Sequence, residues 1–313
     1  MKIIKPKKLS KGDVIGIISP ASSADDFTKV ESGVRYLEKL GYKVEVGKNV
    51  GKYHGYLAGD DNERVEDLHY MFRKKYVNAV ICVRGGYGTP RLLDKIDYKV
   101  IKANPKILVG YSDITALQMA IMCKTGLVTF AGPMLAVDLA EEVSSFTEEV
   151  FWAMITSNKK FGRINQPDDE KIFKLVKGSS KGRIIGGNLT MISALMGTKN
   201  LPEFKEKILF IEEIGEVPYR VDRMLNQLRL AKVFNQVKGV ILGTFTDCNE
   251  TDPAKKTLSL GEVAADYFGK LKIPVIYNLR CGHVKDSITI PMGVMVKLNA
   301  TANVLEIMES AVS

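Results

Sequence analysis

One serine, Ser112, stands where an apparent β-strand gives way to an apparent helix. Residues 107–117 read Ile-Leu-Val-Gly-Tyr-Ser-Asp-Ile-Thr-Ala-Leu, which is an apolar run, a short polar turn and a helical pattern. A serine at such a turn is lifted above the sheet, and the first N–H groups of the helix point toward anything bound there. This placement suits a nucleophile, although Ile114 replaces the second glycine of a G-x-S-x-G turn. On this segment alone, a plain helix N-cap, which serine makes well, is the favoured interpretation.

A glycine-rich loop follows another apolar run. Residues 84–88 read Arg-Gly-Gly-Tyr-Gly directly after the apolar residues 79–83. Glycines permit positive φ and a close approach of the backbone, so that neighbouring N–H groups can converge on an anion. A phosphate and an oxyanion would fit such a loop equally well. The chain has no G-x-x-x-x-G-K-S/T or G-x-G-x-x-G spacing here, which argues against phosphate, and a simple tight turn is the remaining alternative.

The acid and base candidates lie in the second half of the chain. Glu212 and Glu213 end the apolar run 208–211, and His283 follows Gly282 shortly after the apparent strand 275–277. Carboxylates at the end of an apolar strand either face water or orient a base. A histidine after a strand is well placed to project into a cleft, although a loop histidine with one backbone hydrogen bond is the simpler alternative.

Three arginines are candidates for binding a substrate carboxylate. Arg84 begins the glycine-rich loop, and Arg220 and Arg223 share one face of a predicted helix shortly after Glu212. A buried carboxylate needs a cation or several N–H donors. Exposed ion pairs on the protein surface are the alternative role for all three side chains.

The elements that would position these residues alternate along the first half of the chain. Strands are predicted at 14–19, 42–46, 78–83 and 106–111, with helices at 27–40, 64–72 and after 112. This alternation predicts a parallel sheet with covering helices, whose functional loops gather at the carboxyl ends of the strands.

The second half repeats an α/β pattern after a polar stretch at 157–177. Strands are predicted at 183–185, 208–212, 237–242 and near 275 and 288, helices at 188–196 and 260–271, a turn at Gly186-Gly187, and a final hairpin of 294–298 with 304–308. We therefore expect an N-terminal domain at 1–157, a linker at 158–180 and a C-terminal domain at 181–313. The length of 313 residues suits two domains.

Composition excludes several classes of protein. The chain is 45% hydrophobic and carries a net charge of +9, but its lysines are scattered and no basic motif is interleaved with aromatic residues, so nucleic acid is not an expected partner. No apolar stretch approaches the roughly 20 residues that span a bilayer, and the lysine-rich start lacks the features of a signal peptide. The four cysteines form no CxxC pair, which favours reduced thiols over a zinc site. A cytoplasmic location is expected.

Taken together, these segments resemble the serine LD-carboxypeptidase family, which includes muramoyltetrapeptide carboxypeptidases and microcin-immunity peptidases. The resemblance runs nearly end to end and rests on residues 15–22, 57–60, 64, 67–68, 84–88, 110–115, 132–134, 186–189, 210–216 and 282–283. Each motif is weak alone, but their joint order is highly specific. One departure is Thr129-Phe130-Ala131, where many relatives carry a histidine before the Gly-Pro-Met motif.

The resemblance implies a fold and a catalytic mechanism. The expected fold is a flavodoxin-like α/β domain with a parallel sheet, followed by a smaller swivelling-type α/β domain. Ser112 matches the family nucleophile, His283 the base and Glu212 the acid, whereas Glu213 would face the opposite side of its strand. The oxyanion hole matches the backbone N–H groups of Gly86 and Asp113. No metal or other cofactor is implied.

The implied reaction is hydrolysis of the bond between the L-centre of a diamino acid and a terminal D-alanine in murein tetrapeptides, for peptidoglycan recycling. The diamino acid would be meso-diaminopimelate or L-lysine. Residues 212–220, Glu-Glu-Ile-Gly-Glu-Val-Pro-Tyr-Arg, look more like the murein-recycling branch than the microcin-immunity branch. Two alternatives stay open: a peptidase that cleaves a peptidyl-nucleotide amide, and a non-catalytic ligand-binding protein. The expected partner is a small peptide, and a homodimer is a further option.

Overall fold

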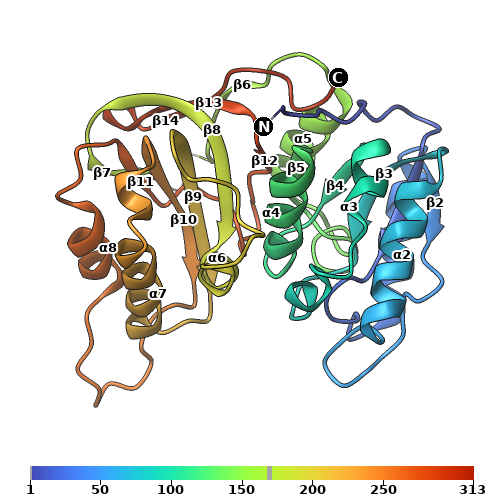
Figure 1. Ribbon diagram of the computed structural model, residues 1–313, viewed down its shortest axis with the longest axis horizontal. Coiled ribbons are helices and arrows are strands. Elements are labelled where there is room, and N and C mark those ends of the chain that lie inside the picture. Colours follow the sequence, from blue (N-terminus) through green and yellow to red (C-terminus); the bar gives the residue numbers. More distant parts are fainter. Residues whose placement is uncertain (1, 168–170) are drawn as a thin grey trace.

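Two α/β halves, each a β-sheet with its own helices, lie side by side in the computed structural model (Figure 1). The model describes residues 2–167 and 171–313. In the described residues the first sheet has six strands in the order β12-β5-β4-β3-β1-β2. Its strands are β1 (Val14–Ile18), β2 (Lys43–Val46), β3 (Val77–Cys82), β4 (Ile107–Val109), β5 (Thr129–Ala131) and β12 (Ile290–Met292). The first five run parallel, and β12 pairs with β5 in the antiparallel sense.

The first sheet is built from apolar runs, because it is covered on both faces. The strands β3 and β4 are almost wholly buried, as expected for central strands of a parallel sheet. The covering helices are α1 (Phe27–Lys39), α2 (Asp61–Arg73), α3 (Tyr98–Ala103), α4 (Ile114–Thr125) and α5 (Ser145–Thr156). Asp60 and Glu63 form a reciprocal capping box that begins α2.

The second sheet has eight strands among the described residues, in the order β6-β14-β13-β8-β9-β10-β11-β7. Its strands are β6 (Gly162–Ile164), β7 (Phe173–Val176), β8 (Ser179–Asn188), β9 (Lys207–Ile214), β10 (Gly239–Thr246), β11 (Val275–Tyr277), β13 (Met295–Asn299) and β14 (Val304–Ile307). The central strands β8 to β11 run parallel, and antiparallel strands complete both edges. The accompanying helices are α6 (Leu189–Leu195), α7 (Pro218–Leu230) and α8 (Leu260–Phe268). The predicted α/β class with two sheets is confirmed.

Helix α4 joins the two layers. It lies between the sheets in Figure 1, contacts both α6 and β8, and is buried on nearly all sides. A helix that is apolar all round is expected in such a position. The Thr115 hydroxyl in its first turn accepts a hydrogen bond of 3.1 Å from the Asn188 amide at the end of β8. The helix that follows Ser112 therefore fixes the first half of the chain against the second.

The structure differs from the expected domain boundaries in three places. Residues 162–164 and 173–176, expected within a linker at 158–180, form the two edge strands of the second sheet. Residues 290–292, expected within the C-terminal domain at 181–313, cross back to pair with β5 of the first sheet. Edge strands are partly exposed and carry polar side chains, so their sequences resemble those of loops and linkers.

The glycine pair Gly186-Gly187 is not the predicted turn, because β8 continues through both residues. Their φ angles are +139° and +136°. A β-carbon on Gly186 would lie 1.8 Å from the Phe210 carbonyl oxygen, and one on Gly187 would lie 2.5 Å from the Thr115 hydroxyl. These glycines permit close approach of β9 and α4 to β8. None of the described helices is long and apolar enough to cross a membrane.

We expect Gly186→Ala to lower the free energy of unfolding by about 3 kcal/mol or more, because the methyl group meets backbone that cannot rotate away. Gly197→Ala is the matched control, since Gly197 also has positive φ but no atom within 4 Å of its would-be β-carbon. The control should lose about 1 kcal/mol from backbone strain alone. Urea unfolding of both variants measures the difference. Equal losses would contradict the proposed contact between β8 and β9.

Candidate active site

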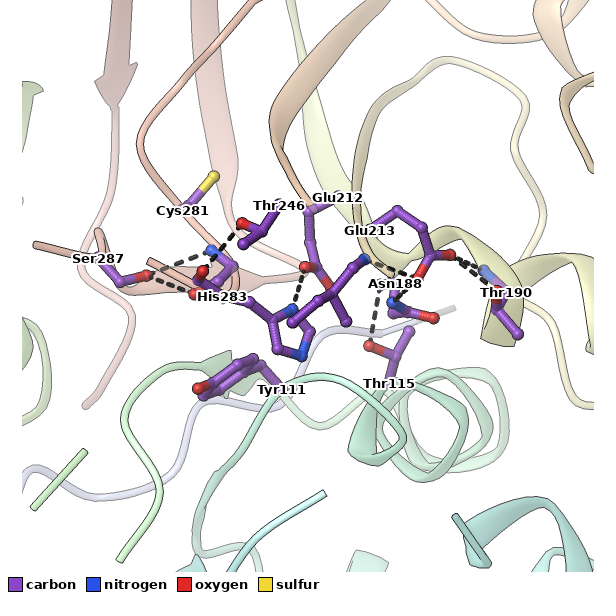
Figure 2. Close-up of polar contacts among 12 residues, drawn as sticks. Tyr111, Thr115, Asn188, Thr190, Glu212, Glu213, Thr246, Cys281, His283 and Ser287 are labelled. Atoms are coloured by element: carbon purple, nitrogen blue, oxygen red, sulfur yellow. Dashed lines mark hydrogen bonds and ion pairs between the residues drawn. The ribbon is translucent and has the colours of Figure 1, made fainter. Parts of the chain in front are cut away.

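His283 and Glu212 form the most direct contact among the predicted site residues. His283 Nδ1 lies 2.8 Å from Glu212 Oε2, as Figure 2 shows. Glu212 comes from β9 and is only 1% exposed, whereas His283 lies in the loop after β11. Gly282 has a φ of +104°, and a β-carbon there would lie 2.4 Å from Glu212 Oε2. Glycine at this position therefore lets the histidine loop pass close to the carboxylate.

The charge of Glu212 determines the protonation of His283. Burial alone would lower the pKa of His283, but the hydrogen bond to Glu212 and its negative charge outweigh burial, so that the pKa is raised above 6.5. A carboxylate can only accept, so Nδ1 carries the proton of this bond and Nε2 is left to exchange protons elsewhere. The Thr246 hydroxyl donates to the His283 carbonyl oxygen at 2.9 Å and holds the loop backbone.

Glu213 faces the other side of β9, as the alternation of side chains along a strand predicts. Its carboxylate accepts hydrogen bonds from the Asn188 side chain at 2.7 Å, from the Thr190 amide at 2.7 Å and from the Thr190 hydroxyl at 2.8 Å. Burial raises its pKa. Glu213 thus fastens the start of α6 to β9 and takes no part in the contact with His283 (Figure 2).

Ser112 occupies the sharp turn between β4 and α4 in the left-handed conformation, with a φ of +63°. A residue with a β-carbon in this region is strained by roughly 1–3 kcal/mol, and such residues gather at functional sites. Asp113 is the residue that caps α4, without a side-chain cap bond, and the Ser112 side chain forms no cap bond in the described part of the chain. The plain N-cap alternative therefore does not explain the serine.

The glycine-rich loop passes directly beside the Ser112 hydroxyl. A β-carbon on Gly85 would lie 3.1 Å from Ser112 Oγ, so a larger residue would crowd it. Within residues 2–167 and 171–313, the backbone N–H groups of Gly86 and Asp113 donate no hydrogen bond. An oxyanion hole requires unpaired backbone donors near the nucleophile.

The Asp113 side chain has a role that sequence reasoning missed. Its carboxylate accepts hydrogen bonds from the amides of Gly88 at 3.1 Å and Thr89 at 2.8 Å, and the Thr89 hydroxyl donates to its carbonyl oxygen at 2.6 Å. Burial raises the pKa of this carboxyl. Asp113 therefore holds the glycine-rich loop against the serine turn. The sequence feature that could have predicted this role is the position of Asp113 directly after Ser112, in a chain whose glycine-rich loop offers backbone N–H groups.

Tyr111 is a second residue that sequence reasoning missed. Its ring meets the His283 ring edge to face, with centroids 4.9 Å apart and planes at 72°. Figure 2 shows the Tyr111 ring next to the His283 ring. In the described residues no hydrogen bond joins Ser112 to His283, but the Tyr111 ring, next to Ser112 in the sequence, contacts the imidazole. Catalytic hydrogen bonds are often long before substrate binds.

Each of the three candidate arginines has a partner near the protein surface. Arg84 pairs with Asp25 at 2.6 Å, and Arg220 pairs with Glu216 at 3.4 Å. The Arg223 guanidinium lies 5.9 Å from the centroid of the Tyr219 ring. Arg84 directly precedes Gly85, whose would-be β-carbon lies 3.1 Å from Ser112 Oγ.

The described residues contain no cluster that could bind a metal ion. Across the described ranges, no three or more His, Cys, Asp or Glu side chains are arranged to hold a metal ion. The four cysteines are free thiols. The absence of a cofactor stays a prediction.

Comparison with known proteins adds independent evidence. The profile of the LD-carboxypeptidase N-terminal domain matches residues 15–132, and that of the C-terminal domain matches residues 181–298. A probable murein peptide carboxypeptidase of Bacillus subtilis (strain 168) is 40% identical over 310 residues, covering 99% of this chain and 95% of that protein.

Two solved structures share the whole architecture. The structure of MccF in complex with glutamyl sulfamoyl guanosine superposes with a TM-score of 0.90 at 28% identity and covers 99% of both chains. The muramoyltetrapeptide carboxypeptidase from Oxalobacter formigenes superposes with a TM-score of 0.82 at 31% identity, covering 94% of this chain and 97% of that one. Both domain profiles and a relative of 40% identity match this chain, and the chain belongs to the serine LD-carboxypeptidase family.

Proposed function

We propose that this protein hydrolyses the bond between the L-centre of a diamino acid and the terminal D-alanine of a murein tetrapeptide. The observation that carries the proposal is the hydrogen bond between His283 and the buried Glu212, with the His283 ring packed against Tyr111, the residue before Ser112. The names of the similar murein peptide carboxypeptidases support the substrate class.

The proposed mechanism assigns one role to each group. Ser112 Oγ attacks the carbonyl carbon, and His283 Nε2 accepts the serine proton and passes it to the leaving amine of D-alanine. Glu212 holds the proton on Nδ1 and stabilises the imidazolium that forms. The N–H groups of Gly86 and Asp113 donate hydrogen bonds to the carbonyl oxygen as it becomes negatively charged. His283 then takes a proton from water, which attacks the acyl-serine carbonyl, and returns that proton to Ser112 Oγ as the peptide acid leaves.

We further propose that the enzyme acts in the cytoplasm, in peptidoglycan recycling. Four free thiols, three of them buried, suit a reducing compartment. A homodimer stays a prediction that analytical ultracentrifugation of the purified chain can check.

A second candidate function follows from the similarity to MccF, whose solved complex contains glutamyl sulfamoyl guanosine. The same serine could attack the carbonyl of an aminoacyl sulfamoyl nucleoside. Incubating the protein with a murein tetrapeptide and, separately, with such a nucleoside distinguishes the two substrates. Faster turnover of the nucleoside would favour the immunity-type peptidase over our main proposal.

We expect Ser112→Ala to fold normally and to lose about three orders of magnitude or more in kcat, because the nucleophile acts as one unit with its base. Mass spectrometry of a murein tetrapeptide should show loss of D-alanine with the wild type alone. Tetrapeptide binding by Ser112→Ala should persist. A wild type that binds the peptide and never cleaves it would instead indicate a binding protein.

We expect Glu212→Gln to lower kcat by about 10³-fold or more, since the amide can no longer hold the histidine tautomer. Glu213→Gln is the matched control on the same strand. It should leave kcat within a few-fold of the wild type and lower the free energy of unfolding by about 1–3 kcal/mol, because its hydrogen bonds to residues 188 and 190 are disturbed. Peptide release and urea unfolding measure the two effects. The reverse ordering in kcat would contradict the assignment.

We expect amidation of the terminal D-alanine to abolish cleavage, because an exopeptidase must recognise a free carboxylate. Arg84→Ala should raise KM for the free acid by roughly tenfold or more if the guanidinium leaves Asp25 to bind that carboxylate. Arg220→Ala serves as control for loss of a surface arginine. Equal cleavage of acid and amide by the wild type would show that no carboxylate site exists.

A further inference from the structure

His283 is contacted from both halves of the molecule, and the two contacts differ in kind. Glu212, from the second sheet, bonds to Nδ1. Tyr111, from the first half, packs against the ring, and its hydroxyl donates to Asp138 Oδ1 at 3.3 Å. The other Asp138 oxygen accepts a hydrogen bond of 2.8 Å from the Met134 amide. A chain of contacts therefore runs from Asp138 through the phenol to the imidazole.

The position of Tyr111 couples this chain to the nucleophile. Tyr111 immediately precedes Ser112 and is only 8% exposed. Rotation of the Tyr111 ring would move the surface against which the imidazole packs. Such a rotation would also disturb the backbone at the start of the serine turn. Asp138 follows β5 in the same half, so the hydroxyl bond fixes the ring relative to the first sheet.

A second contact holds the histidine loop from the same side. Thr147 in α5 donates to the Lys285 carbonyl oxygen at 3.1 Å and accepts a hydrogen bond of 2.9 Å from the Ser287 amide. The loop that carries His283 is thus attached to the first half through its backbone. The hydrogen bond to Glu212 and the packing of Tyr111 act on the imidazole ring itself.

The charges around the imidazole are unevenly placed. Glu212 and Glu213 approach from β9, Tyr111 and Asp138 from the first half, and the Cys281 thiol lies on the histidine's own loop. Burial raises the pKa of Asp138 to about 6, and its negative charge contributes to the raised pKa of His283. On its outer side, Asp138 borders a surface pocket of about 390 Å³ that Glu141, Glu142 and Lys285 also line.

We infer that Tyr111 and Asp138 are positioning residues for the base: Asp138 fixes the phenol, and the phenol ring orients the His283 imidazole toward Ser112. The inference rests on the proposed function and adds two residues to it. Because a misplacement of about 1 Å at reacting groups can lower the rate by 10²-fold, a restraint on ring rotation has a measurable effect. The negative charge of Asp138 also favours the imidazolium that forms during proton transfer.

The test uses Tyr111→Phe and Asp138→Asn with a murein tetrapeptide as substrate. Tyr111→Phe keeps the ring and loses the bond to Asp138, so kcat should fall about tenfold while KM stays within about twofold. Asp138→Asn should move the acid limb of the kcat profile to lower pH. The sign follows from the raised pKa of His283: the base works only when neutral, and removal of a nearby negative charge makes protonation harder.

Direct titration of His283 by NMR in the substrate-free protein gives the same information without turnover. Its pKa should fall in Asp138→Asn and stay close to the wild-type value in the control Tyr70→Phe, which removes a comparable tyrosine–carboxylate bond of 2.6 Å to Glu45 on the far edge of the first sheet. Thermal unfolding of all variants shows that the fold is retained.

The outcomes are distinguishable. A wild type that releases no D-alanine would overturn the proposed function, and the NMR titration would still decide whether Asp138 acts on His283. An active wild type whose kcat, acid limb and His283 pKa are all unchanged in Tyr111→Phe and Asp138→Asn would overturn the inference and leave the function intact.

Discussion

The site depends on a carboxylate that has no access to water. Glu212 is 1% exposed at the inner end of β9, and an ionised carboxyl buried without a partner is unfavourable by several kcal/mol. His283 supplies the compensating donor at 2.8 Å. Several neighbouring features are consequences of that pairing: Gly282 leaves room for the oxygen, Thr246 holds the loop backbone, and the histidine is biased toward its protonated form.

Glu212 lies on β9 of the second sheet and His283 in the loop after β11, whereas Ser112 lies in the turn between β4 and α4. The catalytic unit that we propose is divided in this way, and it requires that the two halves of the molecule keep a fixed relation. Several contacts serve that purpose, and they concentrate around the site. Helix α4 is buried between the layers, the Thr115 hydroxyl binds the end of β8, and β12 carries the chain back into the first sheet directly after the histidine loop. The stability of this interface and the alignment of the site thus rest on the same residues.

Local patterns were sufficient for much of this architecture. Apolar runs such as Val14–Ile18 identify buried parallel strands, and alternation along β9 separates Glu212 from Glu213. Long-range pairings were not predictable in this way. The edge strands β6 and β7 read as a polar connection, because half of each faces solvent, and β12 gives no sign of which sheet it joins. The contact of Tyr111 with His283 joins residues far apart in sequence, so only the packed structure reveals it.

The serine turn combines a strained backbone at Ser112 with a buried carboxylate at Asp113. Ser112 is held at a φ of +63°, a conformation that an isolated chain would leave. The next residue, Asp113, directs its carboxylate to the amides of the glycine-rich loop, and its own backbone N–H is left unpaired beside the serine hydroxyl. The Asp113 side chain therefore ties the serine turn to residues 88 and 89 of the glycine-rich loop. Because these hydrogen bonds form within the folded chain, the relative positions of the turn and the loop are set before any substrate binds.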